Sequence, residues 1–179
     1  IGENLVGILN HRLSQIGRQN PYNFEFHLLR DPNSINAFAL PGGQIFITDA
    51  LFSKLSTEGQ VAGVLGHEVG HVIERHGNQK MAKQKLTQGL VSGAGIAGGG
   101  YNSARMAQSV AQMINMSYGR EAELESDKWG VMLCTESGYD PRAMIDVMDI
   151  LEKSSGAGPP EMMSTHPKPA NRKKYIQDV

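Results

Sequence analysis

The stretch AGVLGHEVGHVIERHG, residues 62–77, constrains this chain more than any other part of its sequence. Its apolar residues indicate a helix, yet it places His67, Glu68 and His71 among core-type neighbours. Positions i and i+4 of a helix share one face, so the two imidazoles can bind a single metal ion, with Glu68 beside it to hold a water molecule. Burying these three groups without a metal would be costly unless each were paired. We therefore predict a helix that packs on one face and presents a metal ion to a cleft on the other.

A catalytic zinc ion needs a third protein ligand and an open position. The metzincin arrangement would need a glycine where this chain has Glu74 and a histidine where it has Gly77, so it does not apply. His76 comes five residues after His71 and points away from the metal face. We interpret His76 as a cation near the carbonyl groups at the end of the helix.

The remaining carboxylates lie in YGREAELESDKWG, residues 118–130. Glu121 and Glu125 share one face of a helix, and Glu123 and Asp127 share another at the same i, i+4 separation. One of the second pair can bind zinc while the other accepts a hydrogen bond from a ligand histidine. Glu121 and Glu125 would then form a solvated face, although spacing alone leaves Glu125 as a rival ligand.

Hydrophobic periodicity predicts an α+β fold, with a small, mostly antiparallel sheet of about three strands packed on several helices. Strands are expected over residues 23–30 and, as a pair joined by a turn at residues 41–43, over residues 36–48. Helices are expected over residues 3–17, 49–55, 57–76, 103–118, 120–137 and 141–153, from residue 79, and after residue 169. We expect Asp49 to cap the second helix, and Thr57 with Gln60 to form a capping box after Ser56. Residues 154–161 resemble a linker loop, and no break in composition divides the single domain expected over residues 1–179.

Composition excludes several classes of function. A net charge of -1 provides no electrostatic footprint for nucleic acid or an anionic membrane surface. The single cysteine, Cys134, cannot form an internal disulfide, and we interpret it as a small buried hydrophobe.

The glycine-rich segment 89–100 is too short to span a membrane, and the sequence does not choose among a flap, close helix packing and disorder. The chain begins at Ile1, so we expect a processed or trimmed form whose removed part could include a signal peptide.

These motifs together resemble the gluzincin zinc peptidases of the HtpX and CAAX-prenyl-protease family. As in that family, HEVGH is followed on a later helix by E-x-x-x-D, here within REAELESDKWG. The stretch INAFALPGGQIFIT resembles the strand pair that precedes the family's metal helix, and STHPKPANR resembles the family's C-terminal segment. The likeness covers residues 35–172 and implies Glu123 as the third ligand, with Asp127 orienting a ligand histidine. It also implies an endopeptidase acting on unfolded or membrane-derived polypeptides. The chain is more similar to the soluble bacterial members, often periplasmic or lipoprotein-anchored, which argues against prenylated or membrane-embedded substrates.

The resemblance leads to a mechanism with one zinc ion held by His67, His71 and Glu123. Glu68 would accept a proton from an activated water molecule and return it to the leaving amine. His166, in STHPKP, is a candidate to stabilise the oxyanion. It could instead occupy the open metal position and hold the enzyme latent, or be a histidine of a surface loop. Arg172 is expected to stabilise this segment or the cleft.

Residues Asn36, Ala37, Phe38 and Ala39 are the candidate substrate-binding segment, because an exposed strand edge can bind an extended peptide by backbone pairing. A plain edge strand is the alternative. We expect a zinc-dependent endopeptidase for extended or unfolded polypeptides in protein quality control, located in the periplasm or cell envelope. A chaperone-like quality-control factor with a latent zinc site plugged by His166 is a second hypothesis. A structural zinc domain is disfavoured, because Glu68 would have no role in it.

Overall fold

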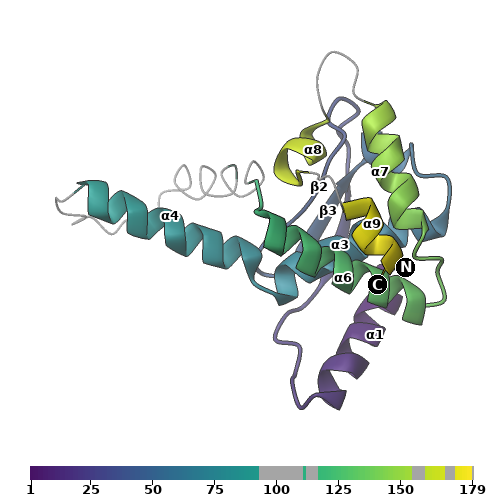
Figure 1. The fold of residues 1–179 in the computed structure, drawn as a ribbon, viewed down its shortest axis with the longest axis horizontal. Helices are drawn as coiled ribbons and strands as arrows, with labels where there is room; N and C mark the ends of the chain where they lie inside the picture. The colour runs from purple at the N-terminus through teal and green to yellow at the C-terminus, as the bar shows by residue number, and fades with distance from the viewer. Residues whose placement is uncertain (93–110, 112–116, 155–159, 168–171, 179) are drawn as a thin grey trace.

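The computed structural model describes residues 1–92, 111, 117–154, 160–167 and 172–178 (Figure 1). Most of the expected helix over residues 103–118, most of the glycine-rich segment 89–100 and most of the expected loop 154–161 lie outside these residues. The elements described are α1 (Gly2–Gln15), β1 (Glu25–Leu29), β2 (Ala37–Ala39), β3 (Gln44–Thr48), α2 (Asp49–Phe52), α3 (Glu58–Ile73), α4 (His76–Ser92), α6 (Arg120–Glu136), α7 (Ala143–Lys153), α8 (Glu161–Thr165) and α9 (Arg172–Asp178). The predicted α+β class is confirmed. None of the helices in this part of the chain is both long and apolar enough to cross a membrane.

The sheet has the predicted three strands, in the order β1-β3-β2. β2 pairs antiparallel with β3, as expected for a hairpin, but β1 pairs parallel with β3. The sheet is therefore mixed rather than mostly antiparallel. The reason is topological: residues 30–36 cross the C-terminal end of β3, so β1 and β2 run in opposite directions with β3 between them.

Helix starts follow the local sequence closely. The predicted capping box is confirmed at α3, where Thr57 Oγ1 accepts from Gln60 N at 3.2 Å and Gln60 Oε1 accepts from Ser56 N at 2.7 Å. At α2 the cap is Thr48 rather than the predicted Asp49. Thr48 is still extended, so its hydroxyl can reach Leu51 N, whereas Asp49 is already helical.

Helix boundaries later in the chain differ more from expectation. α3 ends at Ile73 instead of near His76, and α4 begins at His76 instead of near Gln79. α6 ends before Gly138, which has φ of +83° as expected for a glycine after a helix end. α8 was not predicted, and Pro141 precedes α7 rather than lying in its first turn.

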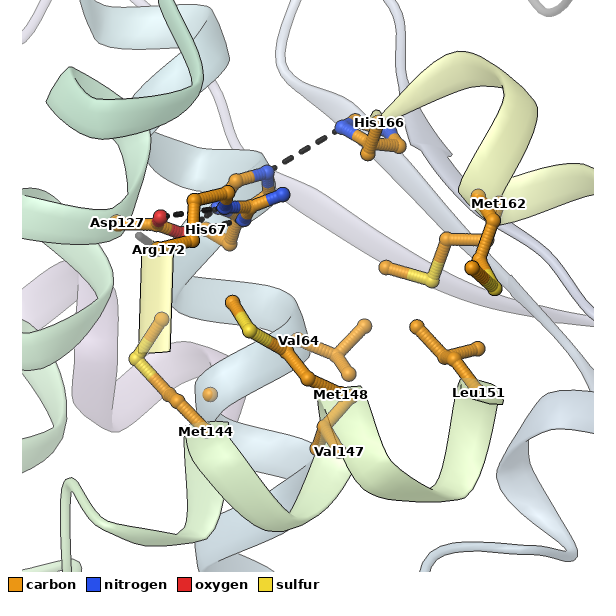
Figure 2. A pocket seen from close by; sticks show the side chains of 12 residues that line it. Val64, His67, Asp127, Met144, Val147, Met148, Leu151, Met162, His166 and Arg172 are labelled. Atoms are coloured by element: carbon orange, nitrogen blue, oxygen red, sulfur yellow. Dashed lines mark hydrogen bonds and ion pairs between the residues drawn. The ribbon is translucent and has the colours of Figure 1, made fainter. Parts of the chain in front are cut away.

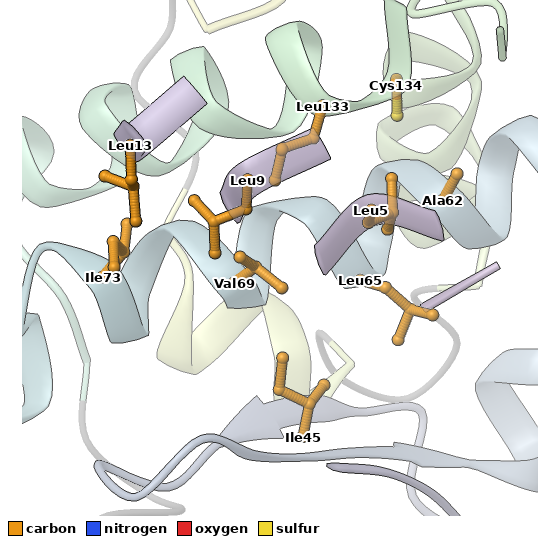
Figure 3. Close-up of a cluster of buried hydrophobic side chains, with 10 residues drawn as sticks. All are labelled: Leu5, Leu9, Leu13, Ile45, Ala62, Leu65, Val69, Ile73, Leu133 and Cys134. Atoms are coloured by element: carbon orange, nitrogen blue, oxygen red, sulfur yellow. The ribbon is translucent and has the colours of Figure 1, made fainter. Parts of the chain in front are cut away.

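α3 lies at the centre of the molecule, between α1, the sheet, α6 and α7 (Figure 1). One face of it joins a hydrophobic cluster of buried residues drawn from α1, β3, α3 and α6 (Figure 3). Its members are Leu5, Leu9, Leu13, Ile45, Ala62, Leu65, Val69, Ile73, Leu133 and Cys134. Cys134 is thus the buried hydrophobe that the sequence predicts. Because α3 is fixed on this side, the orientation of its opposite face is fixed as well.

α3 and α6 pack closely because glycines line their contact. A Cβ atom on Gly70 would lie 2.9 Å from Ser126 Cα and 3.0 Å from Trp129 Cβ. A Cβ atom on Gly66 would lie 3.2 Å from Gly130 Cα. The missing side chains let the two helices approach, and this approach brings the acidic residues of α6 to the histidines of α3.

Gly70→Ala is expected to lower the free energy of unfolding by about 1–3 kcal/mol, because the added methyl group would push against backbone atoms of α6. The matched control is Gly7→Ala, at an exposed site of α1 where a Cβ would meet nothing within 4 Å. That change should stabilise the protein by up to about 1 kcal/mol, because alanine favours a helix interior over glycine. Urea unfolding measures both, and equal effects would contradict the close contact.

Candidate metal centre

The histidines of α3 point their Nε2 atoms at a common point, where α6 and the residue after α8 join them. His67 Nε2 and His71 Nε2 are 3.0 Å apart. The carboxylate of Glu123 lies 3.7 Å from His67 Nε2 and 3.5 Å from His71 Nε2. His166 Nδ1 lies 3.3 Å from His67 Nε2 and 3.2 Å from Glu123 Oε1. One donor atom from each of these four buried residues lies within 4.8 Å of the others, so together they could hold a metal ion.

The charges around this point suit a divalent cation. Glu68, Glu123 and Asp127 are buried, and Arg172 is the buried cation beside them. Three carboxylates against one guanidinium give the site an excess of negative charge, which is costly when desolvated unless a bound cation or a protonated imidazole offsets it. Glu68 Oε1 is also buried without a hydrogen-bond partner. The residues present therefore fit a bound divalent metal.

The pKa shifts of His71 and Glu123 also favour metal binding. Burial holds the pKa of His71 well below its usual value, and the neighbouring histidines add to that effect, so its ring is neutral and has a lone pair to donate. Burial alone would raise the pKa of Glu123, but the adjacent imidazoles of His166 and His71 lower it well below its usual range. His71 thus offers a neutral imidazole and Glu123 an ionised carboxylate, the donor types that zinc takes in proteins. Burial would lower the pKa of His166, but Glu68 and Glu123 beside it raise that pKa above its usual value.

Asp127 and Arg172 orient His67 through Nδ1, the ring nitrogen that faces away from the cluster. Asp127 Oδ1 accepts from His67 Nδ1 at 3.0 Å, which leaves the lone pair of Nε2 facing the cluster. Arg172 Nε donates to Asp127 Oδ2 at 2.6 Å, and its Nη1 donates to Glu123 Oε2 at 2.6 Å. Burial would raise the pKa of Asp127, but its bonds to His67 and Arg172 lower it. One guanidinium from α9 therefore fixes two carboxylates of α6.

The structure distinguishes between the carboxylates that spacing left open. Glu123 lies in the cluster, whereas Glu125 turns outward, with a side chain 61% exposed. Glu125 Oε2 lies 2.9 Å from Nε2 of His76. The prediction that His76 points away from the metal face is wrong: its ring is buried, and its Nδ1 lies 3.0 Å from Nδ1 of His71. The helix predicted to run through His76 breaks at Arg75, where φ is +60°, and the chain turns His76 back under the metal face.

His166 and Tyr118 reach the site from segments far away in the sequence. His166 is 5% exposed, which rules out the surface-loop alternative. Tyr118 stacks on His71 with ring centroids 4.0 Å apart, and its backbone N donates to Thr165 O at 2.9 Å. Sequence reasoning missed Tyr118, since a single aromatic residue before a helix has no pattern that marks it.

The candidate substrate segment lies at the edge of the described sheet. Residues 37–39 form β2, which pairs on one side with β3 and packs on α3. Asn36 exchanges hydrogen bonds with Thr48 through its backbone, while its buried Oδ1 has no partner. Ile35 O accepts from Met162 N at 3.2 Å, which ties α8 and the neighbouring His166 to the start of this strand.

An apolar pocket opens beside His67 (Figure 2). Its walls come from α3, α7 and α8, and Asp127, Arg172 and His166 close the end nearest the cluster. Methionine, valine and leucine side chains point into it in Figure 2, and the apolar lining is Val64, Met144, Val147, Met148, Leu151, Met162 and Met163. Flexible methionine side chains adapt to ligands of different shape.

Comparison with known proteins identifies a peptidase family and several similar proteases. The sequence model of Peptidase family M48 matches residues 3–179. The putative beta-barrel assembly-enhancing protease of Vibrio cholerae serotype O1 is 34% identical over 180 residues, covering 92% of this chain and 36% of the relative. The mitochondrial metalloendopeptidase OMA1 of Arabidopsis thaliana is 32% identical over 79% of this chain and 29% of the relative. Metalloprotease LoiP of Escherichia coli K12 is 26% identical over 88% of this chain and 62% of the relative. The chain spans about a third of the length of the first two of these relatives.

Proposed function

Because the chain belongs to peptidase family M48, we propose that it is a zinc-dependent endopeptidase that hydrolyses extended or unfolded polypeptides. Residues 1–179 would form its single catalytic domain. The observation that carries the proposal is the convergence of His67, His71 and Glu123 beside Glu68, whose buried Oε1 makes no hydrogen bond. A structural metal site would not need a buried carboxylate that makes no hydrogen bond at this oxygen next to its ligands.

In this proposal His67, His71 and Glu123 would hold one zinc ion, through the Nε2 atoms of the two histidines and the carboxylate of the glutamate. When bound, zinc supplies a Lewis acid that activates a water molecule and polarises the scissile carbonyl. Glu68 accepts the proton at Oε1 and returns it to the leaving amine, as a general base and then a general acid. Asp127 and Arg172 keep His67 oriented, so that its lone pair stays on the zinc side.

Two features are proposed to hold the substrate. An extended peptide would pair with the edge of β2, residues 37–39, which gives affinity with broad side-chain tolerance. Asn36, at the start of that edge, has a buried Oδ1 without a hydrogen-bond partner, which could accept from a peptide N–H only if the edge opened on binding. The methionine-lined pocket beside His67 would receive an apolar side chain next to the scissile bond. Asp127 and Arg172, which line this pocket, already pair with each other, so neither needs a charged group from the substrate.

Within the family we propose the soluble bacterial branch rather than the HtpX and CAAX-prenyl-protease branches, with a role in protein quality control in the cell envelope. The names of relatives support this assignment, since one is a beta-barrel assembly-enhancing protease and another a metalloprotease of Escherichia coli. Polypeptides are the proposed partners, and nucleic acid is not expected.

Metal analysis combined with a protease assay tests the function. The purified protein, reconstituted with zinc, should contain one zinc ion per chain and cleave casein. A chelator should abolish cleavage, and added zinc should restore it. A protein that binds no zinc even after reconstitution would rule out this function.

The position of His166 favours a second candidate function, a chaperone-like factor whose zinc site is latent. Its Nδ1 lies among the same donor atoms as the three proposed ligands, where it could fill the fourth position. Its Nε2 lies 3.5 Å from Glu68 Oε1, so it also stands in the way of a water molecule there.

His166→Ala is expected to raise casein cleavage if His166 plugs the site, because the substitution opens the fourth position to water. If His166 instead stabilises the oxyanion, the same substitution should lower turnover by about 100- to 1,000-fold, the usual cost of losing such a donor. Initial cleavage rates of the two zinc-loaded proteins distinguish these roles. An unchanged rate would argue against both.

A further inference from the structure

We infer that His76 and Glu125 form a relay that fixes the tautomer of His71 and thereby its capacity to bind metal. The inference rests on the proposed function only in treating His71 as a metal ligand. It assigns a positioning role to His76, which belongs to a different helix from the proposed ligands and which the sequence pattern places at a helix end, away from the metal face.

The backbone places His76 where it can act. α3 ends at Ile73, and Arg75 adopts φ of +60°, a left-handed conformation that residues with side chains seldom adopt. Among the residues that the structure describes, it is the only non-glycine residue with positive φ. The reversal at Arg75 starts α4 at His76 and directs the ring of His76 back toward α3, where it is 5% exposed.

The contacts form a chain of three side chains. His71 Nε2 faces the metal cluster, and its Nδ1 lies 3.0 Å from His76 Nδ1. The other ring nitrogen of His76, Nε2, lies 2.9 Å from Glu125 Oε2. Ser126 Oγ is 3.4 Å from His76 Nδ1, where its hydroxyl can donate to the same lone pair.

Only one arrangement of protons satisfies this chain and leaves His71 able to bind metal. Glu125 is an acceptor when ionised, so His76 Nε2 must carry a proton and donate it. His76 Nδ1 is then an acceptor, which requires His71 Nδ1 to carry its proton and donate it. His71 Nε2 is left with a lone pair that faces the cluster. Reversing the relay would move the proton of His71 to Nε2, where it would block the metal.

The two proposed ligand histidines are thus held in different ways. His67 donates directly to Asp127, which is buried and fixed by Arg172. His71 donates to an imidazole, whose carboxylate partner has a side chain 61% exposed. His71 is therefore the ligand whose orientation depends on a residue at the surface.

Long-range proton–nitrogen spectra of metal-free protein labelled with nitrogen-15 in its six histidines test the relay directly. We expect His76 to carry its proton on Nε2 and His71 on Nδ1, with the signals assigned from single-histidine variants. A His76 proton on Nδ1 would overturn the inference. This measurement requires neither zinc nor activity, so it stands even if the proposed function fails.

Zinc affinity, measured by competition with a chelator, is the second readout. Loss of a group that orients a ligand usually costs about 10- to 100-fold in metal affinity, and we expect this for His76→Leu, which removes the acceptor. His76→Gln should recover part of the loss, because its amide oxygen can accept from His71 Nδ1. Glu125→Gln should also weaken zinc binding, whereas Glu121→Gln, an exposed carboxylate one turn earlier on α6, should leave it unchanged.

The order of these affinities distinguishes the relay from simple packing. If the glutamine and leucine variants of His76 weaken zinc binding equally, or if Glu125→Gln behaves like Glu121→Gln, the relay does not set the affinity. Because the two carboxylate variants alter a side chain on the surface, they remain informative if a His76 variant fails to fold.

Discussion

Glu68→Gln is expected to lower peptidase turnover by about 100- to 10,000-fold, the range over which positioned general bases contribute to catalysis. The amide has nearly the shape of the carboxylate but cannot accept a proton. Since Glu68 Oε1 has no hydrogen-bond partner and the side chain is 1% exposed, the substitution removes no hydrogen bond at that oxygen. It also neutralises a buried carboxylate whose Oε1 lies 3.5 Å from His166 Nε2, so the free energy of unfolding should change by no more than about 1–3 kcal/mol.

The measurement for Glu68→Gln pairs turnover with zinc content. Zinc should remain bound, because His67, His71 and Glu123 are untouched. Glu58→Gln is the matched control, since Glu58 lies on the same helix but is exposed at its first turn. Full activity in the Glu68 variant with zinc still bound would show that another group takes the proton.

Arg172→Met is expected to have the largest effect on stability. Breaking a buried ion pair by removing one partner usually costs about 3–5 kcal/mol, because the other charge stays buried without compensation. Here one guanidinium contacts both Glu123 and Asp127, whose side chains are 0% exposed. The loss should therefore fall at the upper end of that range in the metal-free protein.

Lys173→Met is the matched control for Arg172→Met. Lys173 is the next residue of α9, and it pairs with Asp149 and Glu152 at the surface. Exposed pairs of this kind contribute about 0–1 kcal/mol. Urea unfolding of both variants compares their free energies of unfolding. Arg172→Lys keeps the positive charge but cannot contact both carboxylates at once, so its free energy of unfolding should lie between the two. If Arg172→Met costs no more than Lys173→Met, the two carboxylates do not depend on the guanidinium.

Zinc provides a second check on the role of Arg172. A divalent ion at the site would compensate Glu123 in place of the guanidinium, so added zinc should stabilise Arg172→Met by mass action. The recovery should be partial, because Asp127 lies behind His67 and not among the donor atoms.

Much of the molecule follows from short-range patterns in the sequence. The helix with His67, Glu68 and His71, the strand pair around residues 41–43 and the capping box at Thr57 all appear where spacing predicts them. Each depends on residues a few positions apart, so local geometry is sufficient to predict it. The errors also have local causes: the helix thought to reach His76 ends early at Ile73, just before the left-handed Arg75, and the cap expected at Asp49 is one residue earlier.

The direction of β1 shows where such patterns stop being informative. Alternation predicts a strand but not its neighbour, and β1 pairs parallel with β3 only because the chain crosses the end of that strand. In the same way, spacing favours Glu123 but leaves Glu125 as a rival ligand, because each has a partner one turn away.

Spacing along the chain is sufficient to predict the kinds of metal-binding group present: two imidazoles and a carboxylate on one helix, with further carboxylates on a later one. Which of the later groups lie beside the histidines depends on how the helices pack. Gly66 and Gly70 let α6 approach α3, so Glu123 and Asp127 reach the histidines while Glu125 turns outward to His76. His166 and Arg172 arrive from the last quarter of the chain. Contacts between residues 40 to 100 positions apart depend on how helices pack, and no periodicity within one segment records that packing.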